Sequence, residues 1–598
     1  MKFGKVFLAA LLAVVVGSIL SGLFWIFTLI GSLGSMGGSA VVVPQSAILK
    51  VDLADNITDS PNTNPFAGFD YATMTSTRSF SLLQTLRALE SAATDARIKG
   101  IYINYSAGGY IGMAAMEELR AALVEFKKCG KFVVAYNDTY SQGGYYLASV
   151  ADKIYIQPEG GMSWQGLGAT LTFFKGAFDK LGLNVEVYRP TSCKYKSAVE
   201  PYILTKMSDA NRRQMQQYID SMWDVIISDV AEARGIDKAA LDRLADTQPM
   251  MLPEDALKAK LVDGIIYQDQ VEDVFTELGV ERNLLGEYEY ISLGDYTSTI
   301  TAPQPTAQPK VGIVYADGDI VDGEEEMPDG HIYGKTLAET IAKARKDESI
   351  KAVVLRVNSP GGSALASDVI WREVELLKAQ KPVVVSMGDY AASGGYYISA
   401  PADAILCNRT TLTGSIGVFG MFMEGGNLFS RRLGLSFDSV KTNTSSDMGS
   451  GLLGVAIRRN TPAESRMIMR SIDKVYGAFT GKVAAGRNLE LKRVLEIAEG
   501  RVWCGADAVK IGLSDGFGGL KSAIALAADR AGIADGFQTE EVLGELSPFA
   551  MFMQSFGAQA RAAFISADEA ALIEEREQLR NAMMRSGIQA YCPYQVAF

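Results

Sequence analysis

A serine followed by two glycines is the feature of this sequence that most suggests chemistry. Residues 392–399 read Ala-Ser-Gly-Gly-Tyr-Tyr-Ile-Ser and follow an apolar run at 382–387 that is typical of a strand. A strand that ends at Ser393 and Gly394 predicts a sharp turn into a helix. Such a turn exposes the serine hydroxyl and leaves the next amide free to face a reacting oxygen. The alternative is an ordinary glycine-rich connection with an incidental serine.

A nucleophilic serine needs a base, and the chain holds a single histidine. This residue, His331, lies in Pro-Asp-Gly-His-Ile-Tyr-Gly, which predicts a loop and makes it an unpromising base. The remaining base chemistry is a lysine kept uncharged by burial. Lys196 in Tyr-Lys-Ser-Ala is the candidate, and Lys194 is a rival because alternate residues of an extended segment point the same way. A surface lysine in an extended loop is the alternative.

The body of the chain repeats one pattern. An apolar strand that ends in two glycines, a helix, a second strand and Gly-Gly-Tyr-Tyr occur in that order in both halves. At the position of Ser393 the first copy has Gln142, which cannot act as a nucleophile. Counting equally from Leu-Gly-Leu in each copy places Met448 opposite Lys196. Because each copy keeps only one of the two groups, we predict a single site assembled from both copies.

Alternating strands and helices with short connections predict parallel βαβ units in each copy. The expected helices and the strands after them span 113–128 and 131–136 in the first copy, and 366–379 and 381–387 in the second. A long helix should follow in each copy. These helices should begin near Ser208 and Thr461, which are good N-caps.

Composition shifts divide the chain into five parts. The prediction is a cytoplasmic stub with a membrane anchor at 1–45, a first module at 46–300 that supplies the lysine, a linker at 301–309, a second module at 310–540 that supplies the serine, and a helical extension at 541–598. The linker is rich in proline and uncharged. Within the extension, residues 557–590 predict a terminal helix whose charges form a solvated face.

The overall composition excludes several classes of protein. Apolar residues make up 48% and charged residues 21%, which is typical of a folded protein with a membrane segment. The net charge of −12 argues against a nucleic-acid partner. The five cysteines are scattered without a CxxC spacing, so neither a disulfide framework nor a zinc site is expected.

The first residues predict a membrane anchor. Residues 6–30 are mostly apolar, and no charged residue occurs between Lys5 and Lys50. A run of this length suits a membrane-spanning helix better than the core of a signal peptide. Because Lys2 and Lys5 precede it, the N-terminus is expected in the cytoplasm and the rest of the chain across the membrane. The alternative is a cleaved signal with Gly-Ser-Ala at 38–40 as the cleavage site.

Several separated motifs resemble the long form of the signal peptide peptidase A family. They are Tyr-Lys-Ser-Ala-Val-Glu-Pro at 195–201, Asn-Ser-Pro-Gly-Gly at 358–362, Ala-Ser-Gly-Gly-Tyr-Tyr-Ile-Ser at 392–399, Leu-Thr-Gly-Ser-Ile-Gly-Val at 412–418 and Gly-Arg-Val-Trp-Cys-Gly-Ala-Asp-Ala at 500–508. Their order makes the resemblance specific, and it covers nearly the whole chain. It implies a membrane-bound serine peptidase with a duplicated ClpP/crotonase-like α/β module. Such an enzyme degrades signal peptides left in the membrane.

The resemblance also implies the catalytic pair. Matched by position, the nucleophile is Ser393 and the general base is Lys196 rather than Lys194. The free amine would take the hydroxyl proton, so the lysine pKa must fall from about 10.4 to near neutrality. Burial can lower a lysine pKa that far. The two modules are therefore expected to close over Lys196.

Three further positions are implied in the same way. The oxyanion hole falls on the amides of Gly394 and Gly362, for which ordinary turn glycines are the alternative. Ser415 matches the serine that orients the lysine amine, and would otherwise be a turn serine. Gly166 is its approximate counterpart in the first copy.

The expected setting follows from the same resemblance. No metal or other cofactor is required. The expected partners are hydrophobic peptides, the membrane and copies of the same chain, in a homotetramer. The expected location is the bacterial inner (cytoplasmic) membrane, crossed once, with the catalytic body on the periplasmic side. Whether the serine meets the lysine of its own chain stays open. Two other functions also stay open, namely an acyl-CoA enzyme of the crotonase type and a non-catalytic membrane scaffold.

Overall fold

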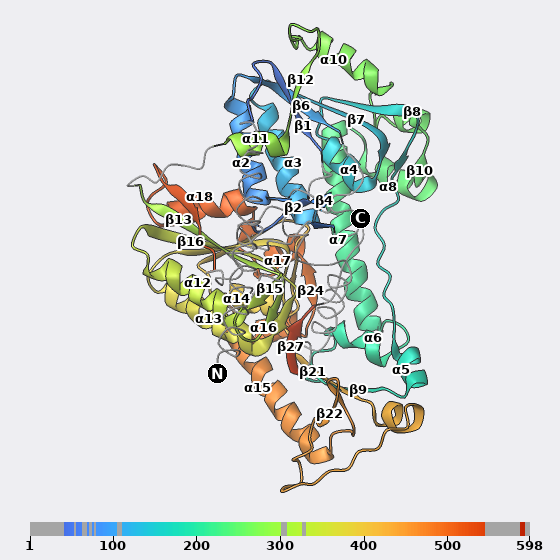
Figure 1. Cartoon of the computed structure of the whole chain (residues 1–598), viewed down its shortest axis with the longest axis vertical. Coiled ribbons are helices and arrows are strands. Elements are labelled where there is room, and N and C mark those ends of the chain that lie inside the picture. Colours follow the sequence, from blue (N-terminus) through green and yellow to red (C-terminus); the bar gives the residue numbers. More distant parts are fainter. Residues whose placement is uncertain are drawn as a thin grey trace, which may run out of the picture.

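Two α/β modules lie one above the other along the long axis of the molecule, and a long helix, α7 (Asp209–Arg234), runs beside both (Figure 1). The structure is a computed structural model. It describes residues 41–52, 56–61, 69–70, 75–76, 79–104, 111–300, 308–325, 330–544 and 587–592.

The first module is built on a mostly parallel sheet in the order β10-β8-β7-β6-β1-β12, with β11 beside β8. The strands are β1 (Ala47–Val51), β6 (Ile98–Ile103), β7 (Phe132–Tyr140), β8 (Lys153–Ser163), β10 (Met250–Met251), β11 (Gly264–Ile265) and β12 (Glu289–Ser292). Helices α2 (Leu82–Thr94), α3 (Met113–Lys127), α4 (Gln142–Ala148) and α11 (Leu293–Thr299) pack around the sheet. The central strands are almost wholly apolar and buried, as parallel strands covered on both faces must be.

The second module repeats this order, as β24-β20-β18-β16-β13-β26, with β19 beside β18 and β25 beside β19. Its strands are β13 (Lys310–Asp317), β16 (Ile350–Ser359), β18 (Val383–Ala392), β19 (Ala404–Cys407), β20 (Leu412–Gly414), β24 (Val502–Cys504), β25 (Gly516–Phe517) and β26 (Gln538–Glu541). Its helices include α12 (Gly334–Lys346), α13 (Ala364–Lys378), α14 (Gly394–Ser399) and α18 (Leu520–Arg530). The duplication inferred from the sequence is therefore a duplication of the fold.

Most of the predicted elements are confirmed. Helices α3 and α13 occupy the two expected ranges, and β7 and β18 follow them but run several residues further than predicted. The side chains of Ser208 and Thr461 cap α7 and the long helix of the second copy, α15 (Pro462–Gly486). The longer strands matter because β18 carries the chain directly to Ser393.

A third sheet joins the two modules. Its order is β15-β14-β17-β27-β21-β23-β22, and β9 lies on the other edge of β21. Its strands are β9 (Asn184–Tyr188), β14 (Asp319–Val321), β15 (His331–Tyr333), β17 (Gly361–Ser363), β21 (Phe419–Glu424), β22 (Gly451–Leu452), β23 (Val455–Ala456) and β27 (Gly587–Tyr591).

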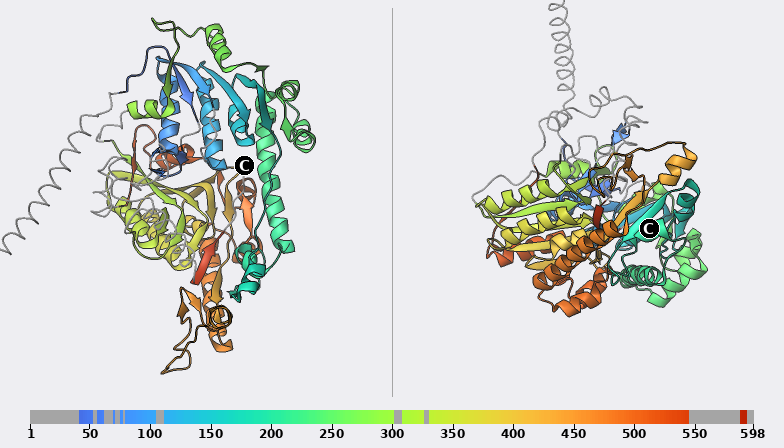
Figure 2. Two further views of the ribbon diagram at one scale, coloured as in Figure 1. Left: turned by 45° about the vertical axis from the view of Figure 1, so that its right-hand side comes forward. Right: turned by 90° about the horizontal axis from the view of Figure 1, so that it is seen from below.

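Strand β9 belongs to the first module but pairs with the second. It runs antiparallel to β21, from Tyr188 opposite Gly420 to Asn184 opposite Glu424. With α5 (Lys175–Leu181) and α6 (Glu200–Ile203), it forms an arm that lies beside the lower part of the second module (Figures 1 and 2). We call residues 175–203 the arm. It carries residues of the first module into the sheet of the second.

Buried charged side chains also join the modules. Arg356 of β16 donates to Asp59 and to Glu118 of α3, and the Arg356–Glu118 distance is 2.8 Å. Asp389 of β18 accepts a hydrogen bond of 2.7 Å from the amide of Ala114, in the first turn of α3. Because a buried charge is costly without its partner, these contacts favour one relative orientation of the two modules.

Two predictions are corrected here. The terminal helix expected over 557–590 lies mostly outside the described residues, but residues 587–591 form strand β27 instead. Local composition favoured a helix, whereas pairing with β17 and β21, which are distant in sequence, determines the strand. His331 begins strand β15 rather than lying in a loop.

The predicted membrane anchor over 6–30 lies outside the described residues. Among the helices that the structure describes, none combines the length and the apolar character that a membrane span requires. Most of the linker predicted over 301–309 also lies outside the described ranges.

Candidate active site

Ser393 occupies a strained turn between a strand and a helix. Strand β18 ends at Ala392, α14 begins at Gly394, and Ser393 between them has φ +56° and ψ −113°. A positive φ is unfavourable for a residue with a Cβ atom, so the surroundings must hold it. The Ser393 amide donates to the carbonyl of Gly414 at 2.8 Å, and its carbonyl accepts from the amide of Tyr397 at 2.8 Å. This is the geometry of a nucleophile elbow.

The same position in the first module has no such turn. Ser141 caps α4 with an ordinary φ of −70°, and Gln142 has no positive φ. The Gln142 side chain accepts from the amides of Gln165 and Gly166 and donates to the Gly166 carbonyl. Gly166 has φ +77° and its counterpart Ser415 has φ +50°, so the matching of the two copies holds in the backbone as well.

The arm of the first module delivers Lys196 to Ser393 of the same chain. The Lys196 Nζ lies 2.6 Å from the Ser393 Oγ, although the two residues are 197 positions apart. It also lies 2.9 Å from the Ser415 carbonyl oxygen and 3.0 Å from the Ser415 Oγ. The sequence-predicted serine, lysine and orienting serine therefore meet at one point.

Lys196 is buried and its pKa is lowered. Its side chain is 1% exposed, and burial lowers the pKa of the amine to about 7. At neutral pH a large fraction of such an amine is uncharged. Lys194, the rival in the sequence, is half exposed and forms an ion pair with Glu499 at 2.9 Å. The chain turns at Lys194 and Tyr195 and does not stay extended, so the two lysines point in different directions.

Backbone contacts fix the loop that carries Lys196. The Arg189 guanidinium donates to the Lys196 carbonyl at 2.8 Å. Gln214 of α7 donates to the Tyr195 carbonyl at 3.0 Å and to the Ser197 Oγ at 2.7 Å. From the second module, the Glu499 carbonyl accepts from the Tyr195 amide at 3.0 Å. The loop is therefore held by both modules.

Gly500 packs directly against this loop. Its φ is +75°, and a Cβ atom added there would lie 2.5 Å from the Lys196 Cβ and 2.7 Å from the Lys196 amide nitrogen. The Gly500 amide donates to the Ile416 carbonyl at 2.9 Å, next to Ser415. Only glycine permits this approach. Gly500 was not predicted as a site residue, although it opens the Gly-Arg-Val-Trp motif of the sequence.

The two glycines predicted for the oxyanion hole lie in α14 and β17, which contact each other. Gly394 is the first residue of α14, so its amide precedes the hydrogen bonds within the helix. Gly362, in β17, has φ +155°, and a Cβ atom there would lie 1.9 Å from the Ile320 carbonyl oxygen. On its other side Gly362 pairs with Ala590 of β27. A glycine is therefore required at position 362 on steric grounds.

The other candidates for chemistry lie elsewhere. His331 lines a cavity of about 130 Å³ together with Asp317 and Glu325, and neither Ser393 nor Lys196 lines that cavity. The five cysteines are free. Within the described ranges, no cluster of histidine, cysteine and carboxylate side chains has an arrangement that could hold a metal ion.

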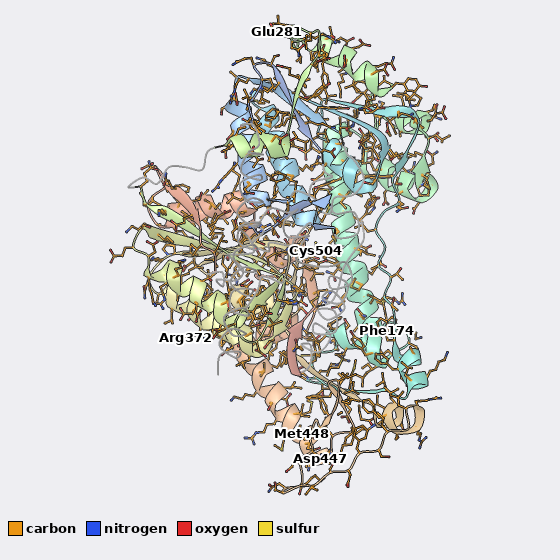
Figure 3. The ribbon with its side chains drawn as sticks, viewed as in Figure 1. Phe174, Glu281, Arg372, Asp447, Met448 and Cys504 are labelled. Carbon is orange, nitrogen blue, oxygen red and sulfur yellow. The ribbon has the colours of Figure 1, made fainter. Side chains whose placement is uncertain are left out.

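Met448, placed by counting opposite Lys196, has no comparable position. It is 39% exposed, and Figure 3 shows it beside Asp447 at the lower end of the molecule, whereas Cys504 lies near the centre. The second copy therefore sends no equivalent loop to the first module at this position.

A family model and the three relatives named below indicate one family. The model described as peptidase family S49 matches residues 125–281 and 375–534, one segment in each module. Protease 4 of Haemophilus influenzae is 36% identical over 463 residues, which is 75% of this chain and 72% of that protein. Protease 4 of Salmonella typhi is 35% identical over 532 residues, 85% of this chain and 83% of that protein. The chloroplastic serine protease SPPA of Arabidopsis thaliana is 33% identical over 460 residues, 76% and 66% respectively.

The contact between Gly500 and the Lys196 loop gives a testable prediction. Gly500→Ala places an alanine in the left-handed backbone region, which lowers the free energy of unfolding by about 1–2 kcal/mol. The collision of the new Cβ atom with the loop lowers it by about 1–3 kcal/mol more. We expect a clear fall in the thermal denaturation midpoint. We also expect faster acetylation of Lys196, measured by mass spectrometry, because the displaced loop exposes the amine.

Gly512→Ala is the matched control. Gly512 has φ +83°, but an added Cβ atom would meet only Leu489, at 3.5 Å. This variant should carry the backbone strain alone, lower the midpoint less and leave the acetylation of Lys196 unchanged. Equal midpoints and equal acetylation in the two variants would contradict the proposed contact.

Proposed function

Because the chain belongs to peptidase family S49 and is a serine protease, we propose that it cleaves peptide bonds with Ser393 as nucleophile and Lys196 as general base. The observation that carries the proposal is the buried contact of 2.6 Å between the Lys196 Nζ and the Ser393 Oγ. Family membership favours this function over the acyl-CoA enzyme and over the non-catalytic scaffold.

The hydrogen bonds around the amine suit a base. An uncharged lysine amine has two N–H groups and one lone pair. The Ser415 carbonyl oxygen can only accept, so one N–H is directed there, and the Ser415 Oγ can take the second. The lone pair is then left for the proton of the Ser393 hydroxyl. Ser415 thus orients the amine without changing its charge.

The proposed reaction proceeds through an acyl-enzyme. Lys196 takes the proton of Ser393 while the oxygen attacks the peptide carbonyl. The amides of Gly394 and Gly362 are proposed to stabilise the oxyanion, and removing such a donor typically costs about 3–4 kcal/mol. Lys196 then gives its proton to the leaving amine and acts as base for the water that hydrolyses the ester. No metal or other cofactor enters these steps.

We extend the proposal to substrate and location. The substrates are hydrophobic peptides, including signal peptides cleaved from secretory precursors. The body of each module has the ClpP/crotonase-like fold. Four copies of the chain assemble as a homotetramer. The apolar run at 6–30 supports a single-pass anchor in the bacterial inner membrane, with the catalytic body in the periplasm. The repeated parallel sheets and the turn at Ser393 support the fold.

The membrane part of the proposal has a simple test. Deleting residues 1–45 should move the protein from the membrane fraction to the soluble fraction, because the apolar run is the proposed anchor. Immunoblots of fractionated cells measure this. External protease added to spheroplasts should digest the full-length chain, and a chain that stays protected would contradict a periplasmic body.

The catalytic pair is tested by substitution. We expect Ser393→Ala and Lys196→Met each to lower kcat/KM for a hydrophobic peptide by about 10⁴-fold or more, because nucleophile and base act as a unit. Lys194→Met is the control, since that lysine lies two residues away and points to solvent. It should stay within about twofold of the parent, as a solvent-exposed side chain makes no contact with the reacting atoms.

Two further measurements sharpen this test. Mixing Ser393→Ala chains with Lys196→Met chains should recover no activity, because the two side chains meet within one chain. Recovery would mean that sites are shared between chains. Full activity of the Lys196→Met variant would exclude the lysine as base.

The lowered pKa of Lys196 predicts the pH dependence. Below this pKa the amine is protonated and cannot accept a proton, so kcat/KM should fall about tenfold per pH unit below about pH 7 and level off above it. A fluorogenic peptide assayed across this range in a constant ionic strength buffer measures the profile. A rate that does not change between about pH 5 and pH 8 would contradict the assignment.

A further inference from the structure

One buried glutamine, Gln214, joins the loop that carries Lys196 to a strand of the second module. It lies in the second turn of α7, the long helix beside both modules (Figure 1), and is 1% exposed. Its carboxamide makes hydrogen bonds to the loop at one end and to strand β24 at the other. This side chain therefore belongs to the interface of the two modules at the point where the reactive groups meet.

On the loop side, Gln214 holds the residues before and after Lys196. Its Nε2 donates to the Tyr195 carbonyl at 3.0 Å and to the Ser197 Oγ at 2.7 Å. The Ser197 Oγ in turn donates to the Tyr195 carbonyl at 3.1 Å. Because a carbonyl oxygen only accepts, the N–H groups of the carboxamide must point to this loop. Lys196 is thus held through both of its neighbours.

On the strand side, the same carboxamide reaches the backbone that supports the two serines. Its Oε1 accepts from the Val502 amide at 3.3 Å. Val502 lies opposite Gly414 of β20, and the Gly414 carbonyl accepts from the Ser393 amide at 2.8 Å. The carbonyl of Arg501 accepts from the Ser415 amide at 2.7 Å. One short strand therefore links this glutamine to the nucleophile and to the serine that orients the amine.

Buried neighbours fix the side chain of Gln214. Its Nε2 lies 3.4 Å from the Oδ1 of Asn211, one turn earlier on α7. The Asn211 Nδ2 donates to Glu200 at 3.0 Å. Glu200 also accepts from the amide and the hydroxyl of Ser208, at 3.1 Å and 2.6 Å. Because Glu200 and Asn211 are buried as well, the start of α7 is held against the chain that follows the Lys196 loop.

From these contacts we infer that Gln214 is a positioning residue that sets the approach of the Lys196 amine to the Ser393 hydroxyl. The inference rests on the proposed function of this pair. A carboxamide fits the place because it offers donors to the loop and an acceptor to the strand. A carboxylate of the same shape cannot donate to the Tyr195 carbonyl, and an apolar side chain satisfies neither partner.

Loss of these contacts should act on the amine in two ways. The loop would shift, and an error of about 1 Å in the position of reacting groups costs about 100-fold in rate. Water would also reach the amine. Burial lowers the pKa of Lys196, whereas the thiols of Cys592 and Cys193 raise it, so a gain of water moves the pKa upward. Because Gln214 is buried within the protein, substrate binding should change little.

The first test is the kinetics of Gln214→Met, which keeps a long unbranched side chain and removes its hydrogen bonds. For a hydrophobic peptide we expect kcat to fall about 30- to 100-fold, with KM within about twofold of the parent. The pH midpoint of kcat/KM should move from about 7 to about 8 or above. An unchanged kcat together with an unchanged midpoint would overturn the inference.

Tyr218→Phe is the matched control. Tyr218 lies one turn further along α7, is 5% exposed, and donates to the Thr410 carbonyl of the second module at 3.4 Å. This variant also removes a buried hydrogen bond between α7 and the second module, but none to the Lys196 loop. It should keep kcat within about twofold and keep the parental pH midpoint. Changes as large as those of Gln214→Met would mean that any loosening of α7 has this effect, and would overturn the inference.

Ser197→Ala guards against misfolding of the methionine variant. It removes one acceptor of the carboxamide and leaves the contacts of Gln214 with Tyr195 and Val502 in place. We expect kcat to fall about 3- to 10-fold, the range for one neutral hydrogen bond, with a thermal denaturation midpoint near that of the parent. Where the methionine variant does not fold, a parental kcat in Ser197→Ala overturns the inference.

The state of the amine is measurable without peptide cleavage. In a Ser393→Ala background, the rate of acetylation of Lys196 by acetic anhydride, followed by mass spectrometry from about pH 5 to about pH 10, gives the pKa of the amine. We expect a midpoint about one pH unit higher with Gln214→Met than without it, and no change with Tyr218→Phe.

This measurement separates failure of the inference from failure of the proposed function. If the difference in midpoint holds while no chain cleaves any peptide, the peptidase mechanism fails and the positioning of the amine by Gln214 stands. If the midpoints are equal while the parent chain cleaves peptides, the inference fails and the proposed function stands.

Discussion

The arrangement of the two modules depends on the burial of the Lys196 amine. Lys196 is almost completely buried, and holding a lysine pKa near 7 rather than about 10.4 corresponds to a cost on the order of 5 kcal/mol for the charged form. After burial, the groups that act on this pKa are two thiols, those of Cys592 and Cys193. A lysine on the surface of either module alone would keep its proton. The pKa of the amine is lowered where the arm of one module packs against Ser415 and Gly500 of the other.

Contacts between charged side chains fix how the modules dock around the buried amine. Arg356 donates to Asp59 and Glu118, and Arg409 donates to Glu117 and Asp229. Carboxylates of the first module thus hold these two arginines of the second. A buried ion pair adds little net stability, but losing one partner is expensive, so alternative dockings are disfavoured. Burial also raises the pKa of Asp389, whose carboxyl lies at the start of α3, and so lessens the negative charge in this interface. The interface is therefore better suited to specify an orientation than to add stability.

The sequence predicted the parts of the site that depend on local pattern. Ser393 was predicted from its place at the end of an apolar strand, and Lys196 from a comparison of the two copies. The copies share one strand order because they share one pattern of apolar residues along the sequence. The pairing of β9 with β21 was not predicted, since antiparallel pairing between distant strands leaves no local signal. Nor was the strand at 587–591, where helix-favouring composition nearby dominated the prediction. The role of Gly500 depends on a close approach between chain segments about 300 residues apart, so its motif was recognised but its contact could not be.

The first module shows why the described part of the chain brings a lysine amine to only one of the two matching turns although the fold is duplicated. At the position of the elbow, the Gln142 amide group is bonded to Gln165 and Gly166 at three points. At the matching positions of the second module, the hydroxyls of Ser393 and Ser415 contact the Lys196 amine, which comes from the first module. The Gln142 side chain makes its hydrogen bonds within the first module and needs no group from elsewhere. Without the Lys196 amine, the buried hydroxyls of Ser393 and Ser415 would lose a hydrogen-bond partner. The glutamine thus fills the first site from within its own module, whereas the arm of the first module completes the second site.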